Sequence, residues 1–421
     1  MSETELLSYC RRYREILCYG AGRYGRIIRI FLLEHGIDIA AFLVSKTKEK
    51  QNAVLEKKVC QISDFLYDRA EQGILLCANE AIRSDMELTL QQQGITEYFI
   101  VDELLVKELD AKTQYNTIFR MKGVNTLLYH RVANLESDIW KLAVTPENFE
   151  FQIKYLKENY NIIRFEEDWP EEAENTVAIT FDDGYLDNYR CALPILEKYE
   201  VPATIFVCTG NMGTDKEFWW DELENIFICG ENKPISDIAI FGKRVNLKDL
   251  GDRVKLCYRV REEILKMPPD EREKFFADLK QQVQYIDRPR DGYRTIREEE
   301  LRELDRSPWI TIGGHTVTHS RLTSETEEQQ MWEIKESKKI IEDIVGHSIT
   351  VFSYPFGSKD DYDIRTIGAA LKAGYKKVAA VALRYEDSKL YETNIPRICI
   401  QQTIDEKGVR GLQKQICLSS N

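Results

Sequence analysis

Short apolar segments alternate with helical segments along the last three quarters of the chain, and this alternation most constrains the fold. The apolar segments include NTLLYHRV, TVAITF, PATIFVC, WITIGGH and TVFSYPFG, with helix-like stretches between them. Strands that alternate with helices build a parallel sheet, either open and doubly wound or closed into a barrel. In such folds the active site lies at the carboxyl ends of the strands. The pattern therefore predicts an α/β domain with a site at one end of its sheet.

A smaller α/β domain is predicted at the N-terminus, over residues 1–115. An apolar strand runs into GAGRYG, a helical pattern follows, and a second apolar strand ends near Val44. Gly20, Gly22 and Gly25 match the G-x-G-x-x-G of Rossmann-like units, in which a helix N-terminus faces a phosphate. No Asp or Glu follows the second strand to bind a ribose hydroxyl, which argues against NAD. The domain either binds a nucleotide or nucleotide-sugar or has a purely structural or partner-docking role.

The second domain is predicted over residues 122–421, with a helical insertion at about 210–295. Within the insertion, FWWDELENIF and the stretch 250–286 are amphipathic and helical in pattern, and the sheet needs no strand from them. The aromatic residues Phe218, Trp219 and Trp220 either attach the insertion to the barrel or stack on a sugar. An insertion in this place could cap the active site.

The charge of the chain excludes some classes of function. The formal net charge is -13 and the pI is near 5.2, whereas nucleic-acid binding requires clustered Lys and Arg. No apolar run approaches the roughly 18 residues of a membrane-spanning helix, and MSETELLSYC lacks the apolar core of a signal peptide. The ten cysteines form no CxxC pair, so buried reduced thiols are expected. We expect a cytoplasmic protein without a membrane span.

Two polar clusters follow apolar strands and can carry chemistry. His315 and His319 lie four residues apart in GGHTVTH, a spacing that suits two imidazoles on one metal ion. Asp182 and Asp183 follow TVAITF, and adjacent side chains at a strand end point to opposite sides. One carboxylate can therefore bind a cation while the other faces the substrate. DDG alone is a common turn signal and a lone HxxxH is more often coincidental, but the two patterns together at strand ends predict a metal site.

With these residues in view, the chain resembles the polysaccharide deacetylases, carbohydrate esterase family four. TFDDGY and HTVTH are similar to the first two motifs of the family, and the resemblance extends over roughly 124–400. It implies a distorted (β/α) barrel and one divalent metal ion, zinc above all, bound by Asp183, His315 and His319. It also implies that Asp182 is the general base. The implied substrate is an N-acetylated sugar or glycan that loses its acetyl group.

Two positions depart from the family pattern. Ser353 stands where the third motif usually begins with an Arg that braces the base, and no His follows His347 to serve as the late general acid. The strand that ends in Tyr129 and His130 resembles the early Tyr-His motif of the poly-N-acetylglucosamine deacetylase subgroup, so His130 is our candidate for the acid. Arg397, on a late strand, either braces the base or pairs with a surface carboxylate.

Tyr354, Pro355 and Phe356 resemble the third motif of the family. The resemblance implies that a backbone N–H near Phe356 stabilises the oxyanion.

The predicted function is metal-dependent N-deacetylation in polysaccharide or cell-surface glycan metabolism. One alternative is a metal-dependent amidase or esterase acting on a non-sugar substrate, because the motifs do not specify the leaving group. Another is a degenerate barrel that binds partner proteins in a glycan-assembly complex. Without an export signal, a lipid-linked or nucleotide-linked precursor is the expected substrate.

Overall fold

The computed structural model divides the chain into two compact units. The first unit comprises Met1–Met121 together with Arg410–Asn421, and the second comprises Lys122–Val409. The expected joint between the domains, at 115–122, lies outside the described residues. The structure describes residues 2–46, 53–55, 57–113, 123–170, 173–228, 238–245, 249–285, 290–381, 393–402 and 409–419.

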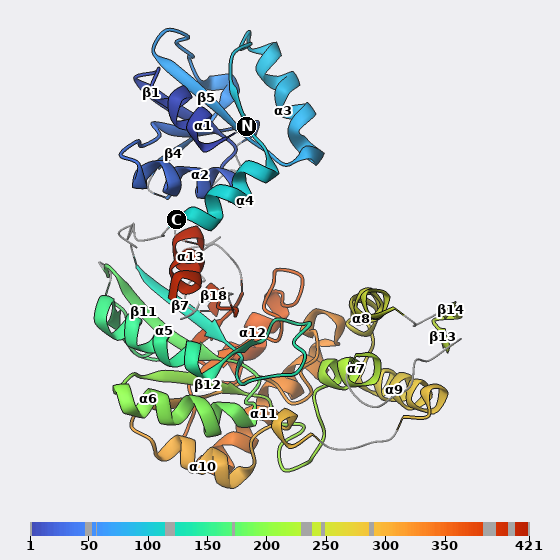
Figure 1. The fold of residues 1–421 in the computed structure, drawn as a ribbon. Coiled ribbons are helices and arrows are strands. Elements are labelled where there is room, and N and C mark those ends of the chain that lie inside the picture. Colours follow the sequence, from blue (N-terminus) through green and yellow to red (C-terminus); the bar gives the residue numbers. More distant parts are fainter. Residues whose placement is uncertain are drawn as a thin grey trace. The chain divides into compact units, whose positions relative to one another are not determined.

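A six-stranded sheet forms the centre of the first unit (Figure 1). Its order is β3-β4-β2-β1-β5-β6, and every pairing is parallel except that of β3 with β4. Strand β1 therefore lies inside the sheet, with β2 on one side and β5 on the other. The elements are α1 (Glu3–Cys10), β1 (Glu15–Tyr19), α2 (Arg23–Glu34), β2 (Ala41–Val44), β3 (Ala53–Val54), β4 (Lys57–Gln61), η1 (Ile62–Asp64), β5 (Gln72–Cys77), α3 (Glu80–Gln92), β6 (Phe99–Val101), α4 (Glu103–Lys112) and α13 (Val409–Ser419).

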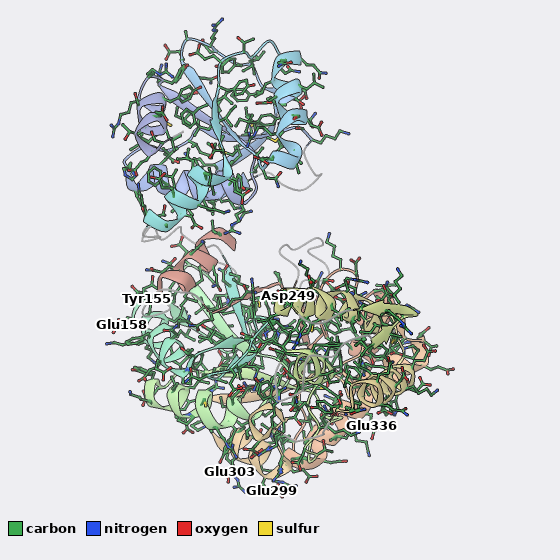
Figure 2. The ribbon with its side chains drawn as sticks, turned by 45° about the vertical axis from the view of Figure 1, so that its right-hand side comes forward. Tyr155, Glu158, Asp249, Glu299, Glu303 and Glu336 are labelled. Atoms are coloured by element: carbon green, nitrogen blue, oxygen red, sulfur yellow. The ribbon has the colours of Figure 1, made fainter. Side chains whose placement is uncertain are left out.

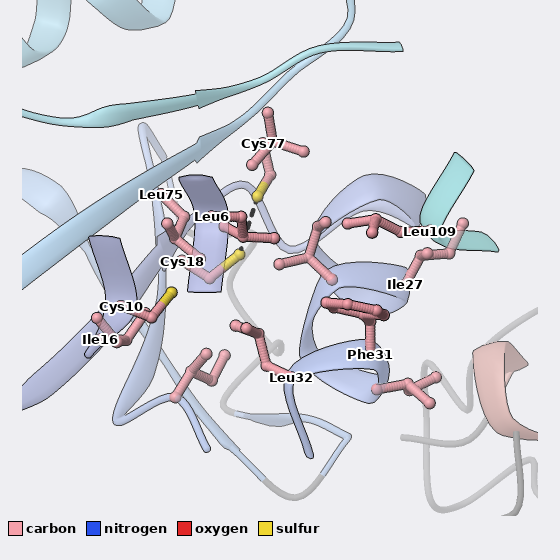
Figure 3. Packing of buried hydrophobic residues seen from close by; sticks show 14 of the residues in the cluster. Leu6, Cys10, Ile16, Cys18, Ile27, Phe31, Leu32, Leu75, Cys77 and Leu109 are labelled. Carbon is pink, nitrogen blue, oxygen red and sulfur yellow. Dashed lines mark hydrogen bonds between the residues drawn. The ribbon is translucent and has the colours of Figure 1, made fainter. Parts of the chain in front are cut away.

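Apolar side chains pack on both faces of this sheet. Cys18 on β1 joins a buried cluster with Phe31 and Leu109 from the helices on one face (Figure 3). Its neighbour Leu17 belongs to the cluster on the opposite face, together with Leu90 of α3. Successive strand side chains point to opposite faces, so a strand covered on both faces must be apolar throughout. This explains the apolar run ILCY, whose four residues are all buried.

The C-terminal helix α13 joins the first unit. Leu418 packs against the buried cluster that contains Phe31, and Lys414 forms an ion pair with Asp110. We expected the barrel domain to extend to residue 421, and the observed grouping differs from that expectation. A single amphipathic helix at the end of a chain carries no pattern that says which domain it covers.

An eight-stranded parallel sheet forms the centre of the second unit. Seven strands follow one another in the order β17-β16-β15-β12-β11-β7-β18, and β10 pairs with β11. The elements are β7 (Val124–Tyr129), β8 (Arg131–Val132), β9 (Ala143–Val144), α5 (Pro146–Asn159), β10 (Asn161–Ile162), β11 (Thr176–Phe181), η2 (Asn188–Ala192), α6 (Leu193–Tyr199), β12 (Ala203–Val207), α7 (Trp219–Phe227), β13 (Ile238–Ile240), β14 (Lys243–Val245), α8 (Leu250–Ile264), α9 (Pro269–Val283), η3 (Asp291–Tyr293), α10 (Glu298–Arg306), β15 (Ile310–Gly314), η4 (Leu322–Ser324), α11 (Glu327–Val345), β16 (Val351–Ser353), α12 (Ile364–Lys372), β17 (Lys377–Ala379) and β18 (Arg397–Cys399).

This sheet nearly closes into a barrel. Ala379 at the end of β17 forms a parallel bridge with Ile395, which lies just before β18 at the other edge. The Ile395 N–H donates to Val378 O at 2.9 Å, and the Ala380 N–H donates to Ile395 O at 2.8 Å. The predicted parallel, barrel-like α/β fold is thus confirmed. Because the strands are parallel, their carboxyl ends all lie at one end of the barrel, where an active site is expected.

Between β12 and β15 the chain leaves the barrel and forms helices α7, α8 and α9, which lie together to one side of the sheet in Figure 1. Their apolar cluster includes Leu223, Cys257 and Phe276. The expected insertion was helical, and the structure adds the hairpin β13–β14. Phe241 and Gly242 form its turn with φ of 50° and 73°, as a two-residue hairpin turn requires.

Charged side chains cover the outer helices of the barrel. Glu158 on α5 and Glu299 and Glu303 on α10 are exposed at the periphery of the second unit (Figure 2). In the part of the chain that the structure describes, no helix combines the length and apolarity needed to cross a bilayer.

Candidate active site

Asp183, His315 and His319 come together at the carboxyl end of the barrel. Asp183 follows β11, and the two histidines lie in the loop after β15. Asp183 Oδ1 lies 3.5 Å from His315 Nε2 and 3.2 Å from His319 Nε2. All three side chains are buried, and one ligand atom from each lies within 4.8 Å of the others. The three residues thus form a group that could hold a metal ion.

The loops that carry this group contain backbone conformations that non-glycine residues rarely adopt. The φ angles are 74° at Asp183, 66° at Thr316 and 53° at His319, and each costs about 1–3 kcal/mol unless the surroundings enforce it. The loop that follows β12 supplies that support at Asp183 and Thr316. The Cys208 N–H donates to Asp183 O at 3.2 Å, and the Thr209 N–H donates to Thr316 O at 3.1 Å. Backbone strain of this kind clusters at functional sites.

Glu333 holds the loop between the two histidines, and the sequence analysis did not single it out. Its buried carboxylate accepts hydrogen bonds from the Val317 N–H at 2.8 Å and the Thr318 N–H at 2.9 Å. The Thr318 hydroxyl donates to the other carboxylate oxygen at 2.5 Å. Hydrogen bonds to an ionised acceptor are about twice as strong as neutral ones. Glu333 therefore fixes the backbone from which both imidazoles project.

A sequence signal for Glu333 exists in retrospect. Gln330, Glu333 and Ser337 recur at the spacing of one helix face, and all three are buried on α11 beside Ile334 and Ile341. A helix that packs on a sheet normally presents apolar residues on that face. Polar residues in those positions indicate internal hydrogen-bond partners, although the pattern does not identify them.

Asp182 is held by Arg397 in a bidentate ion pair. Arg397 Nη1 and Nη2 lie 2.6 Å from Asp182 Oδ1 and Oδ2, and both side chains are buried. Arg397 Nη2 also donates to Ser353 Oγ at 2.7 Å, and Ser353 Oγ donates to Asp182 Oδ2 at 3.2 Å. The guanidinium arrives from β18 and contacts the serine that stands in place of the motif arginine. The structure thus brings Arg397, Ser353 and Asp182 together.

The surrounding charges determine the protonation of the two aspartates. Burial raises the pKa of the Asp182 carboxyl, but the charges of Arg397 and His315 outweigh burial, and the pKa lies below its usual value. Burial also raises the pKa of the Asp183 carboxyl. Hydrogen bonds with His315 and His319 lower it by more than burial raises it, so the pKa again lies below its usual value. Both carboxyls are therefore ionised near neutral pH.

A cavity of about 400 Å³ lies beside the two aspartates, and Asp182, Asp183 and Cys399 line it. His130, which follows β7, lines this cavity as well. Burial lowers the pKa of the imidazole, but Cys399 and the two aspartates raise it, to about 9. Among the described residues, its Nδ1 has no hydrogen-bond partner. The cavity therefore contains a buried imidazole whose pKa lies above its usual value.

The residues of the third motif separate into two environments. Phe356 lines the cavity, with φ of 61° and its ring 4.7 Å from the His319 ring. The Tyr354 side chain is buried, and its hydroxyl donates to Thr393 O at 3.0 Å. Of the described residues in this motif, Tyr354 and Pro355 are not in the cavity lining. The motif therefore reaches the site through Phe356.

The insertion supplies much of the cavity wall. Trp219 and Trp220 from α7 and Tyr258 and Arg261 from α8 all line it. The Trp220 ring lies 4.6 Å from the His319 ring, which brings the insertion into contact with the histidine loop. Insertion and barrel therefore enclose the site together.

A buried arginine connects the barrel to the insertion. Arg131, the residue after His130, pairs with Asp187 at 2.9 Å and lies between the rings of Tyr185 and Tyr293, 4.2 and 4.4 Å from their centroids. Asp221 of α7 is 3.9 Å away and accepts a hydrogen bond from the Tyr185 hydroxyl at 2.5 Å. The sequence analysis missed this network. An arginine directly after the apolar strand NTLLY was a signal for it, because a charge in such a place requires a partner.

The glycines expected to bind a nucleotide lie in the first unit. Gly20 follows β1 with φ of 121°, and Gly22 precedes α2. A Cβ atom on Gly25 would lie 1.9 Å from Gly20 O, and one on Gly20 would lie 2.3 Å from Cys77 O. Packing of the first turn of α2 onto β1 and β5 therefore requires glycine at both positions, with or without a ligand.

Several known proteins are similar to this chain. The family model for polysaccharide deacetylase matches residues 170–232 and 273–378. The Bacillus subtilis protein YxkH, whose name assigns it provisionally to the polysaccharide deacetylases, is 24% identical over 316 residues, 72% of this chain and 80% of that protein. The Staphylococcus aureus poly-β-1,6-N-acetyl-D-glucosamine N-deacetylase is 30% identical over 107 residues, 24% of this chain and 36% of that enzyme. A crystal structure of a Bacillus cereus polysaccharide deacetylase is 20% identical over 71% of this chain and 70% of that chain, with a TM-score of 0.46.

Fold and site together define a class, that of barrel-like α/β proteins with a carboxylate and two imidazoles gathered at the carboxyl ends of the strands. The interruption of the family match, 233–272, coincides with the hairpin and α8 of the insertion. The chain is therefore similar to polysaccharide deacetylases over part of its length.

Proposed function

We propose that the second unit is a metal-dependent N-deacetylase that hydrolyses an acetamide on an N-acetylated sugar or glycan. The observation that carries this proposal is the division of partners between two adjacent carboxylates. Asp183 faces His315 and His319, whereas Asp182 is held by Arg397. One carboxylate serves as a metal ligand and the other as a base, at the same end of the barrel.

The donor set fits a divalent ion such as Zn²⁺. Tetrahedral ligands at about 2.0–2.1 Å from zinc lie roughly 3.3 Å apart, and Asp183 Oδ1 lies 3.5 and 3.2 Å from the two imidazole nitrogens. His315 Nδ1 donates to Ser353 O at 2.8 Å, which leaves its Nε2 lone pair free for the ion. When bound, the ion supplies polarisation of the acetyl carbonyl and acidification of a water molecule.

Residues of the chain supply the proton transfers. The Asp182 carboxylate takes a proton from the attacking water, and Arg397 keeps that carboxylate ionised and oriented. The Phe356 N–H donates to the oxygen that becomes negatively charged. His130, in its protonated form, gives a proton to the departing amine.

Metal content and acetate release test this proposal together. Zinc-loaded protein is dialysed, bound metal is quantified by elemental analysis, and acetate release from N-acetylglucosamine oligomers is measured. We expect about one ion per wild-type chain and none on His315→Ala, because that variant lacks one of three protein ligands. Asp182→Asn and His130→Ala should each retain the ion and lose turnover, since neither residue is a ligand.

The other outcomes separate the alternatives. A metal-free Asp182→Asn protein would mean that the roles of the two aspartates are reversed. Turnover of simple acetyl esters without acetate release from any sugar would favour a non-sugar amidase or esterase. Wild-type protein that binds no metal would contradict the proposal and favour a binding module.

A glycan is the proposed substrate for two reasons. The cavity walls carry Trp219, Trp220 and Tyr258, and aromatic rings offer broad apolar faces to the ring of a sugar. One relative is named for a polymer of N-acetylglucosamine. The chain covers 36% of that enzyme's length, so its substrate is carried over here as a proposal. A role in polysaccharide or cell-surface glycan metabolism would follow.

For the first unit we propose a Rossmann-like fold that takes a nucleotide or nucleotide-sugar beyond the carboxyl end of β1. The support is the position of this strand, since β2 and β5 flank it, and open α/β sheets bind ligands where the strand order changes direction. Titration with UDP and UDP-N-acetylglucosamine should raise the melting temperature of the first unit. Unchanged melting with both ligands would contradict this role.

A further inference from the structure

A second cavity adjoins the active site, and the catalytic residues make no use of it. It measures about 740 Å³, against about 400 Å³ for the catalytic cavity. Its walls come from the loop after β12 and from helices α7 and α9 of the insertion. Trp219 lines both cavities, and Val317 and Thr318 of the histidine loop line the second. The two cavities therefore share a wall, and the second touches the loop that carries His315 and His319.

The lining of the second cavity combines aromatic rings with hydrogen-bonding groups. The rings belong to Phe218, Trp219, Phe276 and Tyr285. Ligand sites typically measure about 300–1,000 Å³ and combine such apolar walls with a few polar groups. A sugar presents both kinds of surface, because its CH groups form apolar faces and its hydroxyl groups donate and accept hydrogen bonds at the rim.

The charges of this cavity favour a neutral occupant. Its lining contains four acidic and three basic side chains. Two of the three bases are engaged, since Lys280 pairs with Glu222 and Arg272 donates to Thr318 O at 3.2 Å. Three of the four carboxylates are engaged as well, since Glu222 pairs with Lys280, Glu217 with Arg290 and Asp215 with Arg297. A phosphate or another anion would therefore have to displace existing partners to gain a cation. Hydroxyl groups could bind to the same paired side chains without separating them.

We infer that the second cavity is a sugar subsite, so that the substrate is an oligomeric glycan and not a single sugar. This inference rests on the proposed deacetylase function. A glycan whose acetamide lies at the group of Asp183, His315 and His319 extends past Trp219, and a further sugar residue occupies the second cavity. Binding energy gained away from the reacting atoms can then be used to lower the barrier at the acetamide.

Filling the cavity tests the inference. Ala277 on α9 lines the cavity and is exposed at the surface, so Ala277→Trp should occupy the space without disturbing a core. The matched control is Asp278→Trp, an exposed neighbour on the same helix whose side chain is not part of the lining. Both changes are made in zinc-loaded Asp182→Asn protein, in which turnover is blocked. Binding of the monomer and the tetramer of N-acetylglucosamine is measured by calorimetry.

We expect Ala277→Trp to weaken tetramer binding about tenfold while monomer binding stays the same, because only the longer ligand reaches the subsite. Asp278→Trp should change neither. Tetramer affinity that is unchanged by Ala277→Trp, an equal loss for both ligands, or no tetramer binding at all would overturn the inference. Because this measurement needs no turnover, absence of acetate release would refute the proposed reaction and would leave the subsite to be judged by binding alone.

Discussion

The carboxyl ends of the strands differ between the two sheets in the groups that meet there. In the first unit the strand ends meet through small groups, where Gly20 and Gly25 pack closely around the end of β1 and against Cys77 of β5. In the second unit a charged side chain follows a strand end, and Asp182, after β11, is buried in an ion pair with Arg397, the first residue of β18. Both units are α/β, but of these two ends it is the one in the second unit that gathers ionisable side chains able to transfer protons.

This difference determines how each end can fail. An end made by backbone contacts has no room for a Cβ atom, so a larger residue costs stability. At an end made by buried charges, each charged side chain needs its partner. Removing one partner leaves the other charge buried and unpaired, which lowers stability and alters its orientation and protonation. Substitutions in the first unit should therefore alter folding of that unit, and substitutions in the second should alter activity and metal binding.

The largest effect is expected from Arg397→Ala. This change leaves the Asp182 carboxylate buried without its partner, which should cost about 3–5 kcal/mol of stability. Acetate release should fall about 100-fold or more, within the range that a positioned base contributes. Arg397→Lys, which keeps the charge but not the bidentate geometry, should fall between wild type and Arg397→Ala. Unaltered kcat in the alanine variant would show that the base needs no brace.

Glu333→Gln should act on the metal site through the histidine loop. The variant keeps the size of the side chain but replaces an ionised acceptor, which holds Val317 and Thr318, with a neutral one. Loss of such support typically lowers metal affinity about 10–100-fold, measurable by competition with a chelator. The control is Glu336→Gln, a partly exposed position on the same helix. Equal zinc affinity in both variants would remove Glu333 from this role.

Gly25→Ala tests the end that is made by backbone contacts. Its Cβ atom would lie 1.9 Å from Gly20 O, and relief of such a clash typically costs about 1–3 kcal/mol. Gly22→Ala is the control, because a Cβ atom there meets nothing within 4 Å. Hydrogen exchange of the β1 and β5 amides should report faster opening in Gly25→Ala, while acetate release stays at the wild-type rate. A loss of acetate release would show that the two units are coupled.

The smallest effect is a change in the pH dependence of stability. Burial raises the pKa of Asp221 to about 7, in spite of nearby Arg131. The folded protein then keeps this proton up to about pH 7, whereas the unfolded chain releases it near pH 4, so this group lowers stability as pH rises from about 4 to 7. Asp221→Asn should show a smaller loss over that range in urea unfolding of the second unit. Identical pH profiles for both proteins would contradict a raised pKa.

The sequence predicted those parts of the site that lie in contiguous segments. Asp182 and Asp183 are adjacent, and His315 and His319 are four residues apart, so a short pattern contains each pair. The alternation of strands and helices then placed both pairs at one end of a parallel sheet. The barrel-like fold was predictable for the same reason, because local periodicity determines strands and helices before any distant contact forms.

The contacts that hold the site together were harder to predict. Arg397 lies 215 residues from Asp182, and only its position on a late strand suggested a bracing role. Glu333 acts through the backbone of another segment, which leaves no paired pattern in the sequence. The turn of hairpin β13–β14 depends on a left-handed conformation at Phe241. Phenylalanine rarely adopts this conformation, so its presence in the sequence does not predict the turn. Such features depend on tertiary geometry, and local propensity does not encode them.

Arg397 belongs to β18, the strand that meets the first barrel strand, β7, and so completes the ring. The three candidate ligands all precede it in the chain. During synthesis the three residues that could hold a metal ion therefore leave the ribosome before Arg397, the proposed brace of the base. A nascent or truncated chain could hold its metal and still be inert, so closure of the barrel would act as a safeguard that delays hydrolysis until assembly is complete.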